Sequence, residues 1–276
     1  MLGAIAGDII GSPYEFNRNN IKITDFPLFS ERSRFTDDTV MTFAIARAIM
    51  KTTPEHGAVP DKKAFVEAVI DSMHEMGHLY PHAGYGSKFV VWLSHKSRQP
   101  YGSIGNGSAM RVSPVAWAFN DLETVELFAA LSAVVTHNHP EGVKGAQAVA
   151  SAICLALCGN TKELIRDYIT DRYGYDLTRT LDEIRPGYKF DATCPGSVPE
   201  AITAFLEGES YEDTIRKAVS IGGDSDTIAC IAGGIAEAFY GVLPENIMRG
   251  VLLILDDRLR GIFEEWCTWM TGGSEE

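Results

Sequence analysis

The sequence predicts an all-helical protein that folds as a single domain, residues 1–276. Apolar residues recur at helical spacing in most segments of the chain, and few stretches show the alternation that is typical of strands. Two similar segments, in which acidic residues precede small apolar ones, lie near opposite ends of the chain at residues 36–39 and 224–227. No tandem repeat, low-complexity region or obvious linker lies between them. We therefore expect one domain whose two ends fold together.

The first expected helix covers residues 1–11 and consists largely of Ala, Gly, Leu and Ile. Its glycines, Gly3, Gly7 and Gly11, fall four apart, so one helix face carries no side chains and another helix can approach it closely. Residues 226–240 have a similar Ala- and Gly-rich composition, which predicts a helix that is buried on most sides.

The other elements follow from the same periodicity. Residues 17–34 and 173–194 are polar and aperiodic, so we expect loops there, with short helical turns in the second. The remaining helices are expected at residues 36–50, 61–77, 87–95, 122–135, 141–157, 195–206, 211–220, 244–255 and 256–270.

Carboxylates open two of these helices. Side-chain oxygens at a helix start accept hydrogen bonds from unpaired backbone N–H groups, so helix capping is one explanation. A cap needs only one residue, however, whereas Asp224 and Asp226 can converge on one point after the turn that Gly222 and Gly223 permit. Such oxygen ligands suit Mg²⁺, Mn²⁺ or Ca²⁺. The second acidic segment, residues 36–39, strengthens the cation hypothesis because both helix starts can face one site.

Two loops carry further polar groups. Residues 101–111 are rich in glycine and precede a helix, so their backbone N–H groups can cradle a phosphate, although a simple tight turn explains the glycines equally well. The loop lacks the Lys-Ser/Thr ending of a P-loop. His137 and His139 lie two apart in another loop, where they can bind a metal, cap the next helix or contact a ligand.

Composition narrows the class of protein. Hydrophobic residues at 45% and charged residues at 22% are typical of a globular domain, and the net charge of −13 argues against a nucleic-acid or membrane surface. The five cysteines lie mostly in apolar runs, and Cys154 and Cys158 form only a weak zinc signal without further ligands. The chain shows neither a signal peptide nor a run of ~20 apolar residues. We expect a cytoplasmic protein, with a monomer as the plausible state.

Five short segments, taken together, resemble the ADP-ribosylglycohydrolase family, which includes dinitrogenase reductase-activating glycohydrolase and the ADP-ribosyl-acceptor hydrolases. They occur in the family's order and span nearly the whole chain. The segments are Gly-Asp-Ile-Ile-Gly-Ser-Pro-Tyr-Glu (7–15), Phe-Thr-Asp-Asp-Thr (35–39), Gly-Asn-Gly-Ser-Ala-Met-Arg (105–111), Thr-His-Asn-His (136–139) and Gly-Gly-Asp-Ser-Asp-Thr (222–227).

The resemblance implies a compact orthogonal helix bundle with a two-metal centre in a cleft, occupied by two divalent cations, Mg²⁺ or Mn²⁺. Asp226 is the residue expected to bridge both ions. The metal ligands that the resemblance implies are Thr36, Asp37, Asp38, Asp224, Asp226 and Thr227.

The resemblance also implies where the substrate binds. The loop at residues 103–108 is expected to hold a diphosphate through backbone N–H groups and Asn106, His137 to contact substrate, and Tyr101 to stack on adenine. The implied substrate-binding residues are Tyr101, Ser103, Gly105, Asn106, Gly107, Ser108 and His137.

Three further charged residues have open roles. Glu15 matches a family position used as general acid/base or as a metal-gated switch, although an ordinary loop acid is the alternative. With Glu15, the implied catalytic residues are Asp37 and Asp38. Asp8 either supports the site from behind or caps a neighbouring backbone, and Arg111 pairs either with these acids or with the diphosphate.

The expected function is metal-dependent hydrolysis of the ribosyl bond in an ADP-ribosylated protein or related ADP-ribose conjugate, with release of ADP-ribose. Cleavage passes through an oxocarbenium-like state that needs a placed water and help for the leaving group. The motifs do not distinguish arginine, serine, poly-ADP-ribose or O-acetyl-ADP-ribose linkages, a choice that we expect residues 17–34 and 173–194 to make. A catalytically silent ADP-ribose-binding or structural family member, and a two-metal phosphoester hydrolase, are the alternatives.

Overall fold

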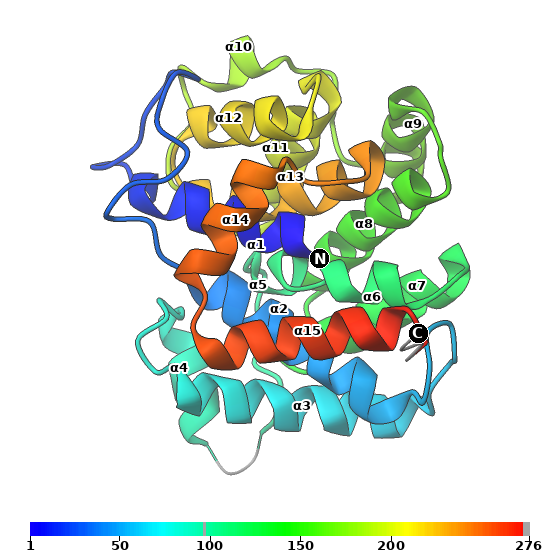
Figure 1. The fold of residues 1–276 in the computed structure, drawn as a ribbon. Coiled ribbons are helices and arrows are strands. Elements are labelled where there is room, and N and C mark those ends of the chain that lie inside the picture. The colour runs from blue at the N-terminus through cyan, green and yellow to red at the C-terminus, as the bar shows by residue number, and fades with distance from the viewer. Residues whose placement is uncertain (96–97, 273–276) are drawn as a thin grey trace.

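Helices α1 (Leu2–Gly11) and α13 (Ser225–Tyr240) lie against each other in the interior of the computed structural model (Figure 1). The structure describes residues 1–95 and 98–272. A Cβ atom on Gly7 would lie 2.0 Å from the carbonyl oxygen of Ala229, and one on Gly11 would lie 2.6 Å from the Cα of Asp226. The expected glycine face is confirmed, since these backbones approach more closely than any side chain would allow.

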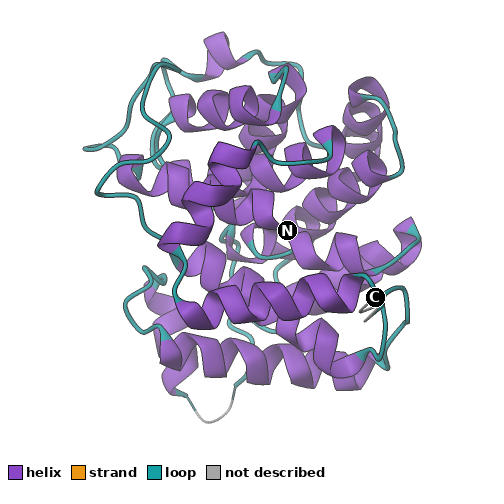
Figure 2. Ribbon diagram, viewed as in Figure 1, coloured by secondary structure: helices purple, strands orange, loops and turns teal. Residues whose placement is uncertain are grey.

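Helices make up the regular structure, and residues 1–95 and 98–272 contain no strand (Figure 2). This confirms the all-α prediction. Besides α1 and α13, the elements are η1 (Ser12–Tyr14), α2 (Asp37–Thr52), α3 (Lys62–Leu79), α4 (Ser87–Ser94), α5 (Gly107–Met110), α6 (Ser113–Ala118), α7 (Leu122–Val134), α8 (Pro140–Leu157), α9 (Lys162–Tyr173), α10 (Leu181–Ile184), α11 (Cys194–Glu207), α12 (Tyr211–Ile221), α14 (Glu245–Ile254) and α15 (Asp257–Met270).

Two groups of helices meet around α1 and α13. Helices α8, α11 and α12 pack on α13, whereas α3, α6 and α15 pack on α2. In Figure 1, α8 and α14 cross the direction of α3 and α15 steeply, so this bundle is not an up-and-down one. Helix α1 contacts both α2 and α13, and one buried hydrophobic core runs through the whole. The start of α2, the start of α13 and the end of α1 thereby come together.

The expected helices are all present, but α9 and the short helices α5 and α6 were not among the expected ranges. Helix α9 (Lys162–Tyr173) was not expected, because only Ile165 and Ile169 of its residues are buried and the apolar pattern is thin. The short helix α10 matches the helical turns expected between residues 173 and 194. None of the described helices has both the length and the apolar character that a membrane span requires. Residues 273–276 of the expected domain range lie outside the described residues.

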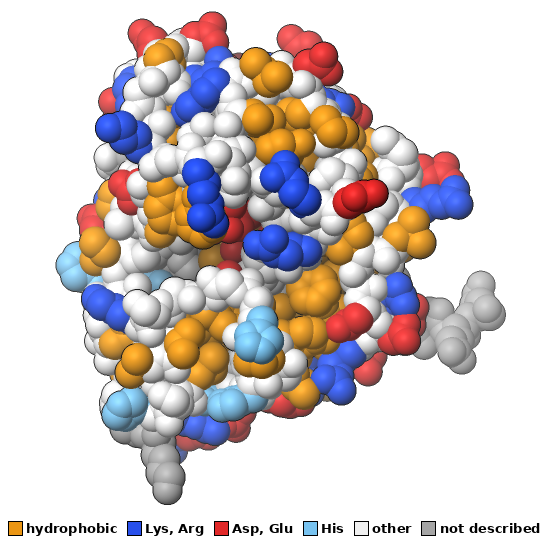
Figure 3. Space-filling view, turned by 90° about the vertical axis from the view of Figure 1, so that its left-hand side faces the viewer, with side chains coloured by type: hydrophobic (Ala, Val, Ile, Leu, Met, Phe, Trp, Pro, Cys, Tyr) orange, Lys and Arg blue, Asp and Glu red, His pale blue; other side chains and the backbone are white. Residues whose placement is uncertain are grey.

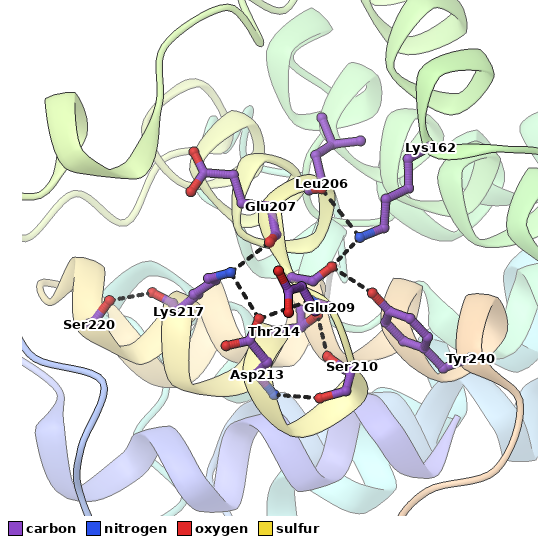
Figure 4. A network of polar contacts seen from close by, with 11 residues as sticks. Lys162, Leu206, Glu207, Glu209, Ser210, Asp213, Thr214, Lys217, Ser220 and Tyr240 are labelled. Carbon is purple, nitrogen blue, oxygen red and sulfur yellow. Dashed lines mark hydrogen bonds and ion pairs between the residues drawn. The ribbon is translucent and has the colours of Figure 1, made fainter.

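The end of α11 is bound by side chains from three other helices (Figure 4). The ammonium of Lys162 donates hydrogen bonds to the carbonyls of Leu206, at 3.2 Å, and of Gly208. Tyr240 donates to the same Gly208 carbonyl at 2.6 Å, and Lys217 donates to the carbonyl of the last residue of α11. Because the last carbonyls of a helix have no partner inside it, these bonds join α9, α12 and α13 to α11.

Candidate functional site

A cavity of about 460 Å³ lies where the starts of α2 and α13 meet the glycine-rich loop. Its wall includes residues 84–89, part of the segment 101–111, and Phe190 with Ala192, so these three segments reach one space. On the face shown in Figure 3, acidic side chains lie at the bottom of a hollow, with basic and hydrophobic side chains around it. The two acidic segments of the sequence are therefore brought to one cavity.

The first carboxylate cluster joins three helices. One carboxylate oxygen from each of Asp8, Asp38 and Asp226 lies within 4.8 Å of the others, and all three residues are buried. Asp8 comes from the middle of α1 and accepts hydrogen bonds from the backbone N–H of Thr36 at 2.9 Å and of Thr39 at 3.2 Å. Asp8 thus caps the start of α2, which is one of the two roles left open for it, and it also stands among the candidate cation ligands.

The second cluster consists of Glu15, Asp224 and Asp226, again with carboxylate oxygens within 4.8 Å of one another. Glu15 directly follows η1 and is partly exposed, whereas the two aspartates are buried. Asp226 belongs to both clusters, which fits the bridging position expected for it. Asp224 is the N-cap residue of α13 but makes no side-chain capping bond, so capping does not explain its presence.

The two threonines and Asp37 contribute differently. Thr36 is the N-cap of α2, accepting from the N–H of Asp38, and its hydroxyl donates to Asp8 at 2.7 Å. Thr227 lines the cavity with its hydroxyl 3.4 Å from Asp38. Asp37 also lines the cavity but lies outside both clusters. Helix capping therefore explains the presence of Thr36, whereas Asp37 and Asp38 face the cavity.

Burial and mutual repulsion keep these acids from ionising freely. Burial, with the negative charge of Asp226 beside it, raises the pKa of Glu15 to about 8 and that of Asp37 to about 8. The pKa of Asp8 rises to about 7 for the same two reasons, and burial raises that of Asp38 well above its ordinary value. Since like charges at this spacing are unfavourable, the carboxylates must either hold protons or hold cations.

The residues fit divalent cations of the oxygen-binding kind. Every group in the two clusters is a carboxylate, and hard cations such as Mg²⁺ and Mn²⁺ take oxygen ligands. One carboxylate oxygen of Asp38, Oδ1, is buried with no hydrogen-bond partner among the described residues. A buried acceptor without a partner is costly, and a cation at this point would satisfy it.

The glycine-rich loop at residues 101–111, called the glycine loop from here on, forms one wall of the cavity. Ser103, Gly105, Asn106 and Gly107, four of the substrate-binding residues that the resemblance implies, line it. The amide of Asn106 donates to Asp224 at 2.6 Å, so this side chain contacts the carboxylate cluster. Ser108 is fully buried and lies away from the cavity wall, because its hydroxyl donates to the carbonyl of Gly142 at 2.7 Å.

His137 and Tyr101 lie beside this loop on the cavity wall, with ring centroids 6.2 Å apart. His139 does not reach the cavity. It is the N-cap of α8, where its Nδ1 accepts from the backbone N–H of Glu141 at 3.2 Å. Of the roles left open for the two histidines, the structure thus gives His139 helix capping and leaves His137 free to face a ligand.

Further residues at the cavity were not singled out from the sequence. Tyr85 lines it, and its hydroxyl is buried without a partner among the described residues. Its neighbours Gly84 and Gly86 are the signal that would have marked this turn. Phe16 and Phe190 also line the cavity with ring centroids 5.1 Å apart, although no local pattern relates them. They bring the ends of the loops 17–34 and 173–194 to one rim.

Comparison with known proteins agrees with this geometry. The ADP-ribosylglycohydrolase family model matches residues 1–270. ADP-ribosylhydrolase ARH3 of Homo sapiens is 30% identical, with 89% of this chain and 86% of that protein covered. ADP-ribosylarginine hydrolase Tri1 of Pseudomonas putida is 26% identical, with 88% of this chain and 70% of that protein covered.

A solved structure described as an ADP-ribosylglycohydrolase-related protein complex shares the fold. It superposes with a TM-score of 0.65 at 22% identity and covers 99% of this chain and 96% of its own. The family model spans nearly the whole chain, and the resemblance seen in the five short segments is confirmed. This chain belongs to the ADP-ribosylglycohydrolase family.

Proposed function

We propose that this protein is a metal-dependent hydrolase that cleaves the glycosidic bond between ribose and its acceptor in an ADP-ribose conjugate and releases ADP-ribose. The observation that carries the proposal is the pair of carboxylate clusters sharing Asp226 at the cavity that the glycine loop and His137 also line. The names of the similar proteins, an ADP-ribosylhydrolase and an ADP-ribosylarginine hydrolase, support the substrate class.

Two divalent cations, Mg²⁺ or Mn²⁺, are the proposed cofactors, and when bound they would orient ribose hydroxyls and lower the pKa of a water. Asp38 and Asp226 are the best-supported ligands, because they lie in the buried cluster that includes the unpartnered oxygen. The other proposed ligands are Thr36, Asp37, Asp224 and Thr227.

The chain's own groups would divide the remaining work. Glu15 is at the cavity but on a loop, so its carboxyl group can hold a proton and pass it to or from a reacting oxygen or nitrogen. The partly exposed backbone of Gly105 and Gly107, which lines the cavity, can receive phosphate oxygens without steric hindrance from a side chain. Tyr101 provides an aromatic face at the same wall, for which adenine is a suitable partner.

We further propose a cytoplasmic monomer, formed by one domain over residues 1–276, that acts on an ADP-ribosylated protein or small ADP-ribose conjugate. The acidic composition of the chain is unfavourable for direct contact with nucleic acid.

The test measures release of free ADP-ribose from arginine-linked and serine-linked ADP-ribosyl peptides, with Mg²⁺, with Mn²⁺ or with chelator. Asp226→Ala should abolish metal-dependent turnover, because it removes the carboxylate that both clusters share. Asp167→Asn is the matched control, since Asp167 is exposed on α9 and pairs with neighbouring Arg166.

Release from either linkage establishes the activity and names its acceptor class. AMP or phosphate as the product would instead establish the phosphoester alternative. Binding of ADP-ribose without release from any ADP-ribosyl linkage would leave a binding protein and overturn the proposal.

A further inference from the structure

A buried arginine forms part of the cavity wall. Arg111 is 1% exposed, and among the described residues no carboxylate pairs with it. Its guanidinium donates to the carbonyls of Gly107 at 3.0 Å and of Ser132 at 2.9 Å, and to the hydroxyl of Thr136 at 3.0 Å. One N–H group of Arg111 thus donates to Thr136, the residue before His137. This contact belongs to neither of the two roles left open for Arg111.

The hydroxyl of Thr136 connects Arg111 to His137. A guanidinium only donates hydrogen bonds, so the threonine oxygen must accept from Arg111. The Nδ1 of His137 lies 2.7 Å from the same oxygen. Among the described residues, Nδ1 is the acceptor available to the hydroxyl hydrogen of Thr136. Thr136 is fully buried, so a hydroxyl hydrogen without an acceptor would be costly.

We propose that Arg111 and Thr136 hold His137 as a neutral imidazole with its proton on Nε2, which makes Nε2 a fixed hydrogen-bond donor to an oxygen of the bound ligand. Since Thr136 donates to Nδ1, that nitrogen carries no hydrogen, and a neutral ring has its hydrogen on the other nitrogen. Arg111 and Thr136 are positioning residues, because they act through His137.

The charge state of the ring is set by its surroundings. His137 is 4% exposed, and burial together with the positive charge of Arg111 lowers its pKa well below the ordinary value. Tyr101, from the loop on the same wall, also faces the ring, and burial raises the pKa of its phenol to about 12. Near neutral pH Arg111 keeps its positive charge and Tyr101 stays uncharged, so neither neighbour favours a protonated ring and His137 stays neutral.

Nε2 points toward the glycine loop. A Cβ atom placed on Gly105 would lie 3.5 Å from Nε2, and one on Gly107 would lie 3.3 Å from it. Among the described residues Nε2 has no hydrogen-bond partner, and His137 lines the cavity with both glycines. The donor therefore faces the space in which a ligand would meet the loop.

This last step rests on the proposed function, from which the ligand is ADP-ribose. ADP-ribose offers phosphate and ribose oxygens, and both accept hydrogen bonds. A neutral donor with a fixed tautomer binds such an oxygen but does not take up a proton, so His137 recognises the ligand and is not the general base.

The tautomer is tested by long-range ¹H–¹⁵N correlation spectra of the histidine rings, with the signals of His137 assigned by their loss in His137→Gln. We expect a protonated Nε2 and an unprotonated Nδ1 in the free protein. Thr136→Val removes the hydroxyl at nearly constant volume and should give mixed tautomers, whereas Thr136→Ser keeps the hydroxyl and should restore the single form. Thr203→Val is the control, because the buried Thr203 hydroxyl bonds to the carbonyl of Pro199 within α11.

Calorimetric titration with ADP-ribose in the presence of Mg²⁺ tests the consequence. Thr136→Val should weaken binding by about tenfold, the scale of one hydrogen bond, whereas Thr136→Ser and Thr203→Val should bind like the parent. A protonated Nδ1 in the parent protein, or an unchanged tautomer and affinity in Thr136→Val, would overturn the inference. No ADP-ribose binding by the parent would overturn the ligand assignment together with the proposed function, whereas the spectra test the tautomer independently.

Discussion

The side-chain amide of Asn106 donates a hydrogen bond of 2.6 Å to a carboxylate oxygen of Asp224, and this bond joins the glycine loop to the carboxylate clusters. The same amide nitrogen lies 2.9 Å from the hydroxyl of Ser197 on α11. Asn106 thus holds one candidate cation ligand in place while its backbone remains part of the cavity wall. The diphosphate contact expected from its side chain would have to share the amide with Asp224.

Asn106→Ala should therefore weaken divalent cation binding and lower the free energy of unfolding by about 1–3 kcal/mol, since two buried hydrogen bonds are lost. Cation titration by calorimetry and urea unfolding measure the two effects. Asn160→Ala is the control, because Asn160 bonds to the carbonyl of Leu155 at the end of α8, away from the cavity. An unchanged cation affinity in Asn106→Ala would show that Asp224 needs no such support.

Removal of divalent cations should lower the melting temperature. Five acidic residues reach one cavity, and their repulsion is relieved only by protons or cations. A cation present at about 100 times its Kd adds about 2.7 kcal/mol to the free energy of unfolding. For a chain of this size that corresponds to a shift of about 5–10 °C, measurable by calorimetry with chelator and with added Mg²⁺.

Asp226→Ala should show little difference between chelator and Mg²⁺ in the same experiment. If the parent protein keeps its melting temperature while elemental analysis shows that the metal has left, the carboxylate clusters do not depend on cations for stability.

The metal-free protein should be more stable in mild acid than at alkaline pH. The folded-state pKa of Glu15 and that of Asp37 are raised to about 8 from ordinary values of 4.5 and 3.8. The folded state therefore binds more protons than the unfolded chain between these limits, and the free energy of unfolding falls as pH rises through them. For one such group, the free energy of unfolding falls by about 3 kcal/mol over about two pH units.

Urea unfolding in chelator at about pH 5.5 and about pH 8 measures this slope. Asp37→Asn removes one titrating group, so its free energy of unfolding should depend less on pH. A stability that increases with pH in the metal-free parent would contradict the raised pKa values.

Gly7→Ala should destabilise the fold by about 3 kcal/mol or more, because the added Cβ would lie 2.0 Å from the carbonyl oxygen of Ala229. The backbone of α13 would have to move, and with it Asp226. Gly261→Ala on α15 is the matched control, since a Cβ there meets no atom within 4 Å. Ala is the better helix former, so the control should be stabilised by about 0.5–1 kcal/mol. Equal unfolding midpoints for the two variants would show that α1 and α13 can move apart without loss of stability.

Local features of the chain determined the helices, the glycine face of α1 and the family. Helical periodicity depends on neighbouring residues, so it predicted most elements, and it failed at α9 because only Ile165 and Ile169 are buried there. The acidic segments at 36–39 and 224–227 could be recognised because a cap requires fewer oxygen atoms than each contains. Their meeting in one cavity agrees with the expectation that the chain ends fold together.

Only the tertiary structure decided which partner each polar group takes. Asp8 stands in a carboxylate cluster because α1 lies between α2 and α13, and Ser108 turns away because the carbonyl of Gly142 is within reach of its hydroxyl. Phe16 and Phe190 meet at the cavity although they are far apart in sequence. A hydrogen bond or contact of this kind depends on distances across the fold, which residue type and spacing along the chain do not specify.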